Sequence, residues 1–353
     1  MSKSKLVFDP RSIKEDDFPA TSSTVEKLRF LLNYAVLAPS SHNTQPWNFR
    51  IVNDAIELYA DKTRALPVAD PDYRELTISC GAALFNLRIA IRHFGYGDIV
   101  EILPDENNIN LLARIRIGSR RIVQLEENFL FRAISKRVTN RQNFDSCPLP
   151  ESLILELESA TRAEGSWLQI MTEVILKAHR KAVIDLIAVG DRLQMANPLF
   201  RRELAQWIHI DNNPTHDGIS PHARGMNHNL DAVASLISWT IRSFNTGESQ
   251  AVKDCKLASQ APVLMLISSE DDDRQAWIET GEALAHLLLR ARIDDVWASF
   301  FNQPIQIPRL RSRLQRLFPE HGYPQILLRL GYAKEIGGTP RRSVDEVLNE
   351  VRS

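Results

Sequence analysis

The order of apolar and polar residues predicts amphipathic helices in several parts of the chain. In the first, apolar residues recur at the i, i+3, i+4, i+7, i+8 spacing of one helix face, which comprises Leu28, Leu31, Leu32, Ala35 and Val36. Ser23 and Glu26 form the pattern of a capping box in front of this face. Two further helices, over about residues 74–91 and 277–293, each place small residues ahead of a leucine-rich face. Because small residues let a neighbouring backbone approach closely, we expect both to be core helices.

Alternating patterns predict strands between and after these helices. Residues 49–51 and 56–60 alternate on either side of the turn signal Asn53-Asp54, so they are expected to form a hairpin. A continuous apolar run at 262–267 is typical of a buried strand. Further strands are predicted at 99–103, 111–117, 167–173 and 323–333.

The segment that joins the first helix to the hairpin is dense in proline and short polar residues. It reads Ala38-Pro39-Ser40-Ser41-His42-Asn43-Thr44-Gln45-Pro46-Trp47. The prolines restrict the backbone, and the short donors and acceptors suit the polar edge of a flat heterocycle. A helix stop followed by a hairpin is the ordinary structural explanation of the same residues.

Two basic segments in the second half of the chain are candidates for binding a phosphate. Arg137-Val138-Thr139-Asn140-Arg141 carries two guanidiniums and a hydroxyl, which can donate charge-assisted hydrogen bonds to one phosphate dianion. A solvated basic face is the alternative explanation. The pair Arg341-Arg342 follows the last predicted strand and is weak evidence by itself.

The least regular segment of the chain is 209–230, which lacks apolar periodicity. A loop of this length in a compact chain is usually functional, for example as a lid, or mobile. It contains several histidines and aspartates, namely His209, His216, His222, His228, Asp211 and Asp217. Their spacing fits neither one helix face nor a zinc loop, so we expect a polar, lid-like insertion and no metal site.

Composition argues against several classes of protein. The 353 residues are 44% apolar and 25% charged, as in ordinary globular proteins, and the formal net charge is -1. A chain so close to neutral has no global field that attracts nucleic acid or an anionic membrane. No stretch approaches the roughly 20 apolar residues of a membrane helix, and the first residues lack the apolar core of a signal peptide. Cys80, Cys147 and Cys255 are far apart, which fits a reducing compartment. We therefore expect a cytoplasmic protein.

The polar loop resembles the signature of the nitroreductase family of FMN-dependent proteins. That signature is a Pro-Ser turn followed by Asn-x-Gln-Pro-Trp, and the loop has Pro39-Ser40 and then Asn43 to Trp47. Family members hold the FMN phosphate with Arg-x-Ser-x-Arg or Arg-x-Ser-x-Lys, which resembles residues 137–141 with Thr139 in place of serine. A C-terminal basic pair closes on the same phosphate in the family, in the place of Arg341-Arg342. The resemblance covers about residues 24–348, except for the lid-like insertion.

The order of the two motifs points to a particular branch of that family. Ordinary members carry the Arg-x-Ser motif first and form dimers in which both subunits contribute to each FMN site. Here the Pro-Ser loop comes first, and Glu164-Gly165-Ser166-Trp167 stands where a second loop would be expected. The chain therefore resembles the Acg branch, whose members look like two fused nitroreductase units.

This resemblance implies an α+β, nitroreductase-like fold in which two fused units form an internal pseudo-dimer. Each unit would be a mostly antiparallel sheet flanked by helices. The expected division is an N-terminal arm at 1–23, a first unit at 24–125 and a second unit at 126–353, with the lid-like insertion at about 209–230. The protein would be a monomer with this internal pseudo-dimer, or a homodimer.

The resemblance also implies a set of FMN-binding residues. Along the flavin ring and the ribityl chain we expect Pro39, Ser40, Ser41 and Asn43. Around the phosphate we expect Arg137, Thr139, Arg141, Arg341 and Arg342. Arg74 would reach the pyrimidine edge of the flavin or form a salt bridge with a nearby aspartate. Gln303 lies in the segment 299–304, which matches the place where family members bring backbone amides to the flavin N5.

The implied activity passes hydride from NAD(P)H through FMN to a nitroaromatic or quinone-like acceptor. Because this chemistry belongs to the cofactor, no catalytic residue is assigned. The expected partner is a small-molecule electron acceptor, and we expect neither nucleic acid nor a membrane. The alternative is a non-catalytic flavin-binding protein whose lid sequesters FMN.

Overall fold

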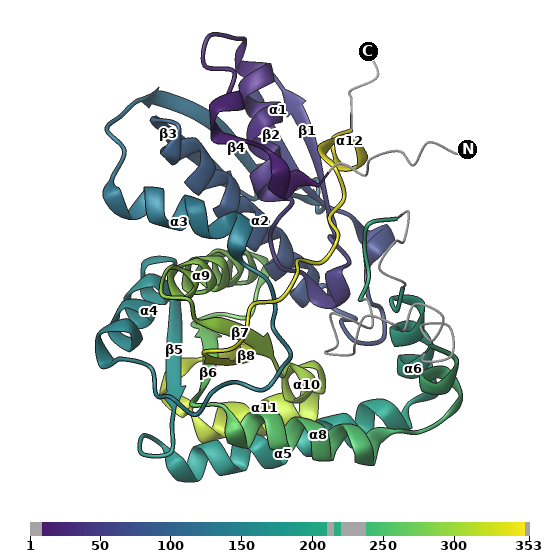
Figure 1. The fold of residues 1–353 in the computed structure, drawn as a ribbon. Coiled ribbons are helices and arrows are strands. Elements are labelled where there is room, and N and C mark those ends of the chain that lie inside the picture. Colours follow the sequence, from purple (N-terminus) through teal and green to yellow (C-terminus); the bar gives the residue numbers. More distant parts are fainter. Residues whose placement is uncertain (1–8, 210–214, 220–237, 350–353) are drawn as a thin grey trace, which may run out of the picture.

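Two four-stranded antiparallel sheets with the same strand order organise the molecule (Figure 1). The computed structural model describes residues 9–209, 215–219 and 238–349. The first sheet has the order β1-β2-β4-β3, with β1 (Trp47–Val52), β2 (Ala55–Ala60), β4 (Leu111–Arg120) and β3 (Tyr96–Ile102). The second has the order β5-β6-β8-β7, with β5 (Ser166–Met171), β6 (Val263–Ser269), β8 (Tyr323–Gly331) and β7 (Trp297–Phe300). The predicted α+β class with two mostly antiparallel sheets is confirmed.

Each sheet is built from the same succession of elements. In the first unit, α1 (Thr24–Ala35) precedes β1, and α2 (Arg74–His93) separates β2 from β3. In the second, α4 (Glu151–Ala163) precedes β5, and α9 (Arg274–Ile293) separates β6 from β7. The order α1-β1-β2-α2-β3-β4 is therefore repeated as α4-β5-β6-α9-β7-β8. The predicted capping box is present at the start of α1.

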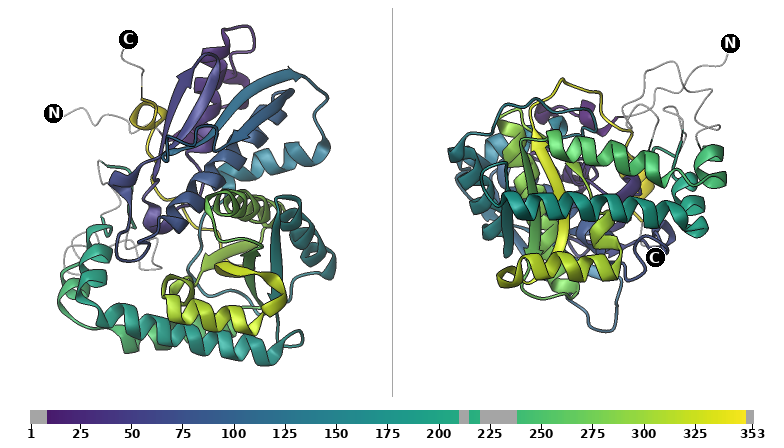
Figure 2. Two further views of the ribbon diagram at one scale, coloured as in Figure 1. Left: turned by 180° about the vertical axis from the view of Figure 1, so that it is seen from behind. Right: turned by 90° about the horizontal axis from the view of Figure 1, so that it is seen from below.

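A long insertion distinguishes the second unit from the first. β1 and β2 are joined by Asn53 and Asp54, which adopt positive φ angles of 48° and 58°, whereas residues 172–262 separate β5 from β6. The insertion contains α5 (Lys177–Ala196), α6 (Pro198–Gln206) and α8 (Gly247–Gln260). Figure 2 shows α5 and α8 side by side. Most of the predicted lid, including Asp211, His222 and His228, lies outside the described residues.

The remaining elements connect these layers. α3 (Leu125–Lys136) follows β4, α10 (Gln303–Gln306) and α11 (Pro308–Leu317) lie between β7 and β8, and α12 (Val344–Val347) lies near the C-terminus. The sequence pattern did not predict α8, β7 or α11. β7 has four residues, too few for alternation to be recognised, and α8 has few apolar residues, so its helical face is weak in the sequence. α11 does carry a helical pattern, with Leu310, Leu314 and Leu317 at i, i+4, i+7 spacing, so a signal for this helix was present in the sequence.

Helices α2 and α9 cross in the centre of the molecule through a reciprocal glycine contact. A Cβ added to Gly81 would lie 2.1 Å from the carbonyl oxygen of Ile278, and one added to Gly281 would lie 2.1 Å from that of Ile78. Each glycine thus packs on the residue three positions before its counterpart. Such self-complementary contacts are typical of a two-fold interface between equal subunits. The close approach expected from the small residues of both helices is confirmed.

The two units also exchange their following segments. Thr139, which follows α3, pairs with Ala298 in β7, and Leu348, which follows α12, pairs with Phe49 in β1. Figure 1 shows the C-terminal segment running from β8 back to the first sheet. α3 buries Phe131 and its other apolar residues in the core of the first sheet, although the division expected at residue 126 assigns it to the second unit. That division stays a prediction.

Layering differs between the two sheets. Helices α4 and α9 cover one face of the second sheet, and α5, α8 and α11 cover the other. The first sheet packs against α1, α2 and α3.

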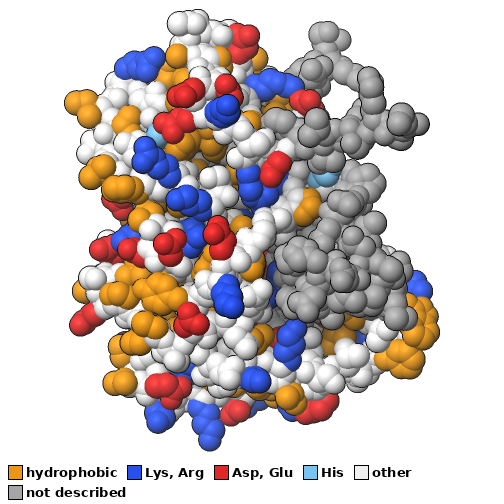
Figure 3. Space-filling model, viewed as in Figure 1, with side chains coloured by type: hydrophobic (Ala, Val, Ile, Leu, Met, Phe, Trp, Pro, Cys, Tyr) orange, Lys and Arg blue, Asp and Glu red, His pale blue; other side chains and the backbone are white. Residues whose placement is uncertain are grey.

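In the part of the chain that the structure describes, no helix has both the length and the apolar character needed to cross a bilayer. Acidic, basic and hydrophobic side chains are interspersed on the face shown in Figure 3, as the small net charge suggests.

Candidate functional site

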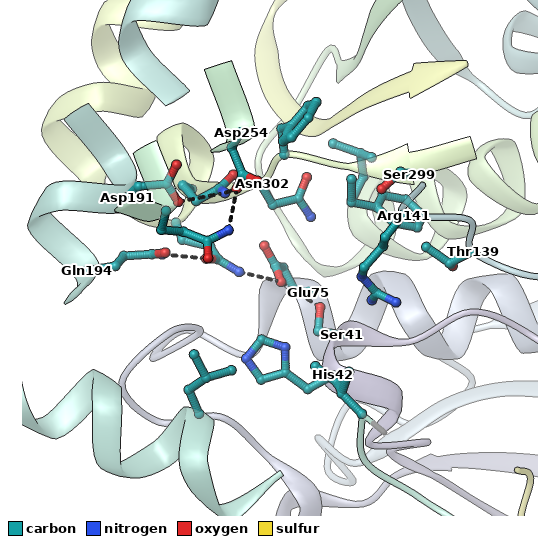
Figure 4. Close-up of a pocket in the computed structure, with 18 of the residues that line it drawn as sticks. Ser41, His42, Glu75, Thr139, Arg141, Asp191, Gln194, Asp254, Ser299 and Asn302 are labelled. Carbon is teal, nitrogen blue, oxygen red and sulfur yellow. Dashed lines mark hydrogen bonds between the residues drawn. The ribbon is translucent and has the colours of Figure 1, made fainter. Parts of the chain in front are cut away.

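A cavity of about 260 Å³ lies between the two units, at the loop that follows α1. The loop contributes Pro39, Ser40, Ser41 and His42 to its lining. The first two turns of α2, the segment after α3 and the end of β7 provide further walls, and the insertion closes the remaining side with α5, α6 and α8. Figure 4 shows Ser41 and His42 facing Asp191 and Asp254 across this cavity.

Three non-glycine residues of the loop have a left-handed backbone. His42, Asn43 and Gln45 have positive φ angles of 51°, 55° and 51°. Asparagine and histidine adopt this region more readily than glutamine, and the strain at Gln45 persists only where the surroundings impose it. Gln45 is fully buried and supplies the restraint. The side-chain Nε2 of Gln45 donates to the carbonyl oxygen of His216 at 2.8 Å, and its Oε1 accepts from the backbone N–H of Arg342 at 2.8 Å. Segments from both the insertion and the C-terminus therefore hold the loop in place.

A buried carboxylate, Glu75, forms the floor of the cavity beside this loop. The Ser41 hydroxyl donates to Glu75 Oε2 at 2.6 Å, and Gln306 donates to the same oxygen at 3.0 Å. Arg74 donates to the other oxygen of Glu75 at 3.3 Å and to the carbonyl oxygen of Gln325 at 2.7 Å. Arg74 does not line this cavity but a neighbouring one. Its ion pair is thus with the adjacent glutamate rather than with an aspartate.

The predicted phosphate motif is divided by the fold. Thr139 and Arg141 line the cavity, and Figure 4 shows Arg141 extending toward Ser41. Arg137 lies behind the loop, where its Nη2 donates to the carbonyl oxygen of Leu37 at 2.9 Å. Burial, followed by the charge of Arg11, lowers the pKa of Arg137 to about 9.

Arg11, Arg137 and Arg341 form a cluster of guanidiniums, here called the arginine cluster. Arg341 donates to Asn43 Oδ1 at 2.7 Å and to Thr339 Oγ1 at 2.6 Å. Burial lowers the pKa of Arg341 well below its usual range, and the charges of Arg11 and Arg137 act in the same direction. The Nε atoms of all three arginines are buried without a hydrogen-bond partner. Buried donors and mutually repelling charges of this kind are the surroundings that an anion would stabilise.

Arg342 and Gln303 take different positions from the rest of the predicted set. Arg342 does not join the arginine cluster, because its guanidinium donates to the carbonyl oxygens of Gln45 at 3.2 Å and Glu346 at 2.6 Å. Gln303 lines the cavity, and its Nε2 donates to Asp191 at 2.9 Å and to Asp254 at 3.0 Å.

Several cavity residues were not predicted from the sequence, and the charged ones already described are Glu75, Asp191 and Asp254. Arg11 of the arginine cluster, which does not line the cavity, was not predicted either. Asp191 had a detectable signal, because it shares the apolar face of α5 with Val183 and Ile187 at i, i+4, i+8 spacing. Burial, followed by the charge of Asp254, raises the pKa of Asp191 to about 8. Apolar residues of the insertion cover the same wall, namely Met195, Phe200, Leu204, Ile219, Ile241 and Leu257.

Comparison with known proteins identifies the family. No protein-family model matches the chain. Rv3131 of Mycobacterium tuberculosis, provisionally named an NAD(P)H nitroreductase, is 30% identical over 349 residues, which cover 94% of each chain. Acg of the same organism, named in the same way, is 25% identical over 94% of this chain and 98% of its own.

Among solved structures, the FMN and NADPH-dependent nitroreductase NfnB from Sphigopyxis sp. strain HMH is 17% identical, covers 62% of this chain and 97% of its own, and has a TM-score of 0.40. The assignment to a family rests on Rv3131, whose sequence is similar to this chain over nearly the full length of both. The chain belongs to the NAD(P)H nitroreductases, a family of oxidoreductases, in the branch that contains Rv3131 and Acg.

Proposed function

We propose that this protein is an FMN-dependent NAD(P)H oxidoreductase that reduces nitroaromatic or quinone-like acceptors. One observation carries the proposal: the arginine cluster presents three buried, unpartnered Nε–H groups directly behind the loop that lines the cavity. A phosphate monoester at the cluster would compensate these charges. A planar ring joined to that phosphate would extend past Pro39 and Ser40 into the cavity. The residues present therefore fit FMN.

In this proposal each predicted segment has a definite task. Arg137 and Arg341 bind the phosphate, and Asn43 orients Arg341 through their 2.7 Å hydrogen bond. Arg141 and Thr139 lie at the cavity wall, where a cation can stabilise negative charge on a reduced ring. Arg342 acts as a positioning residue, because it holds Gln45 and thereby the strained loop.

Bound FMN supplies the two-electron chemistry, with NAD(P)H as donor. The chain supplies the acceptor pocket. Its apolar wall from the insertion suits a flat aromatic molecule, and Asp191 lies on the same side of the cavity. Because the pKa of Asp191 is raised to about 8, its carboxyl is protonated at neutral pH and can donate a hydrogen bond to an oxygen of the acceptor.

The phosphate assignment is tested by Arg137→Ala. Losing one hydrogen bond from a charged group should weaken FMN binding by about 1.5–3 kcal/mol, measured by the change in flavin fluorescence on titration. Riboflavin, which has no phosphate, should bind both proteins equally. Arg132→Ala, at an exposed position in α3, which ends one residue before Arg137, is the matched control. Unchanged FMN affinity in Arg137→Ala would reject the assignment.

The alternative function, sequestration of FMN without turnover, has one observation in its favour. Residues 215–219 of the insertion contact the loop, where the backbone N–H of Gly218 donates to the carbonyl oxygen of Asn43 at 3.3 Å. Anaerobic addition of NADPH to FMN-loaded protein separates the two functions. Bleaching of the flavin absorbance within the mixing time, and its return with a quinone, supports the enzyme. Persistent colour supports sequestration.

A further inference from the structure

We propose that Arg11, in the arm that precedes the first unit, is a third phosphate-binding arginine and makes the site selective for FMN over riboflavin. This inference rests on the proposed function. Arg11 lies outside both basic motifs of the sequence, in the segment expected to be an N-terminal arm.

The backbone around Arg11 is ordered by local hydrogen bonds. Arg11 lies in a short 3-10 turn, Pro10–Ser12, in which Asp9 Oδ1 accepts from the backbone N–H of Arg11 at 3.0 Å. The Ser12 hydroxyl donates to the carbonyl oxygen of Asp9 at 2.7 Å. The Arg11 side chain is 16% exposed, whereas that of Asp9 is 53% exposed. The turn therefore directs the guanidinium into the protein while its carboxylate neighbour stays near solvent.

The guanidinium lies against the C-terminal segment that carries Arg341. A Cβ added to Gly338 would lie 2.6 Å from Cζ and 2.8 Å from Nε of Arg11. The next residue, Thr339, accepts the hydrogen bond from Arg341 through its Oγ1. Only a glycine at 338 leaves room for the Arg11 guanidinium in this position.

Charge at the cluster is poorly compensated by the protein. Asp9 lies 3.5 Å from Arg11 Nη1. In the described ranges, no carboxylate forms a salt bridge with Arg137 or Arg341. Burying three guanidiniums with one exposed carboxylate is unfavourable unless a ligand adds negative charge. A phosphate dianion brings two charges and several acceptor oxygens for the unused Nε–H groups.

The test compares FMN with riboflavin in two pairs of variants. Arg11→Ala should bind FMN about 10-fold to 100-fold more weakly, the scale of one charge-assisted hydrogen bond, and should bind riboflavin as the wild type does. Arg11→Lys should retain part of the FMN affinity. Gly338→Ala should displace the guanidinium and weaken FMN binding in the same selective way. Gly337→Ala is its control, because a Cβ there has no heavy atom within 4 Å.

Each outcome decides one question. If the wild type binds neither flavin, the proposed function fails. If the wild type binds FMN and both Arg11→Ala and Gly338→Ala bind it equally well, the role of Arg11 is overturned while the proposed function stands. Equal losses of FMN and riboflavin affinity would make Arg11 a structural residue and would also overturn the inference. If Arg11→Ala does not fold, as judged by its melting temperature, the two glycine variants decide.

Discussion

Single charged residues around the cavity differ in how the protein compensates their burial. Arg74 and Glu75 pair with each other and with neighbouring polar groups. Arg341 has polar neutral partners and two nearby positive charges. Asp191 has a second carboxylate, Asp254, as its neighbour. Only the first of these arrangements compensates its charges within the protein, so the second suits the binding of an anion and the third a retained proton.

The retained proton on Asp191 predicts a pH dependence of stability. An unfolded aspartate loses its proton near pH 4, whereas the folded protein keeps that of Asp191 to about pH 8. The stability that this group contributes is therefore present below about pH 4 and is lost as the pH rises to about 8. Asparagine does not ionise. The melting temperature of Asp191→Asn should rise relative to that of the wild type between about pH 5 and 8.

Exposed Asp185, on the same helix, provides the control for this prediction. Asp185→Asn should follow the pH profile of the wild type. Parallel melting curves for Asp191→Asn and the wild type across this range would contradict a retained proton on Asp191. Arg192 and Gln303 also face Asp191 and oppose the shift, so both are kept unchanged in the experiment.

At the scale of elements, the crossing of α2 and α9 determines the geometry of the site. α2 supplies Glu75 and Ser79 to the cavity, and α9 supplies Leu284. Their separation is limited by backbone atoms, because the residues at the crossing, Gly81 and Gly281, have no side chain. A change at either glycine should therefore alter both stability and the cavity.

Gly81→Ala and Gly281→Ala should each destabilise the protein. The new Cβ would meet a carbonyl oxygen at 2.1 Å, which no side-chain rotation relieves, so the helices must move apart. We expect a loss of about 1–3 kcal/mol or more from overpacking, despite the roughly 1 kcal/mol by which alanine favours a helix. Urea denaturation measures this loss of folding free energy. Gly337→Ala should stay within about 0.5 kcal/mol of the wild type, and wild-type stability in both helix variants would contradict a close crossing.

At the scale of the whole molecule, the repeat of elements implies a second, pseudo-symmetric position for a flavin site. There the loop after α4 is short, and Glu164 occupies it. Arg88 of α2 donates to Glu164 at 3.1 Å, to Asp98 at 2.9 Å and to Glu282 at 2.5 Å. Burial opposes the charge of Arg88, but Glu282 and Glu164 raise its pKa overall. An ionic network thus fills the position that a ligand occupies in the proposed site.

The filled position predicts one FMN per chain. Titration of the protein with FMN, followed by flavin absorbance after removal of free ligand, should saturate at one equivalent. Two equivalents per chain would contradict the prediction. A preparation that binds one FMN for every two chains would instead place a shared site between separate molecules.

The same network predicts a stability effect that is separate from flavin binding. Arg88→Met removes the guanidinium that pairs with Glu164 and Glu282, whereas Asp98 keeps its ion pair with Arg92. Because Glu282 is buried, the change should cost about 3–5 kcal/mol of folding free energy. FMN affinity should be unchanged, because Arg88 does not line the cavity. Arg116→Met, which removes a half-exposed ion pair with Glu101, should cost less than about 1 kcal/mol. Equal costs in the two variants would show that the network is not buried in solution.

The sequence by itself determined most of the helices (not α8 and α11), the hairpin and the chemical character of the loop at residues 38–47. These features depend on neighbours within a few positions, such as the i, i+4 spacing, the Ser23 cap and the Asn53-Asp54 turn. The small residues of α2 and α9 also indicated that each packs closely on a neighbour, but only the tertiary structure showed that the two helices cross each other.

Only the tertiary structure decided which charged residues meet. Arg341 and Arg342 are adjacent in a segment that is neither helix nor strand, yet their guanidiniums have different partners: one joins the arginine cluster and the other holds Gln45. Arg11 reaches the cluster from more than three hundred positions away, past a glycine whose importance is purely steric. Contacts of this kind depend on how distant segments pack, and no local pattern of residues encodes that.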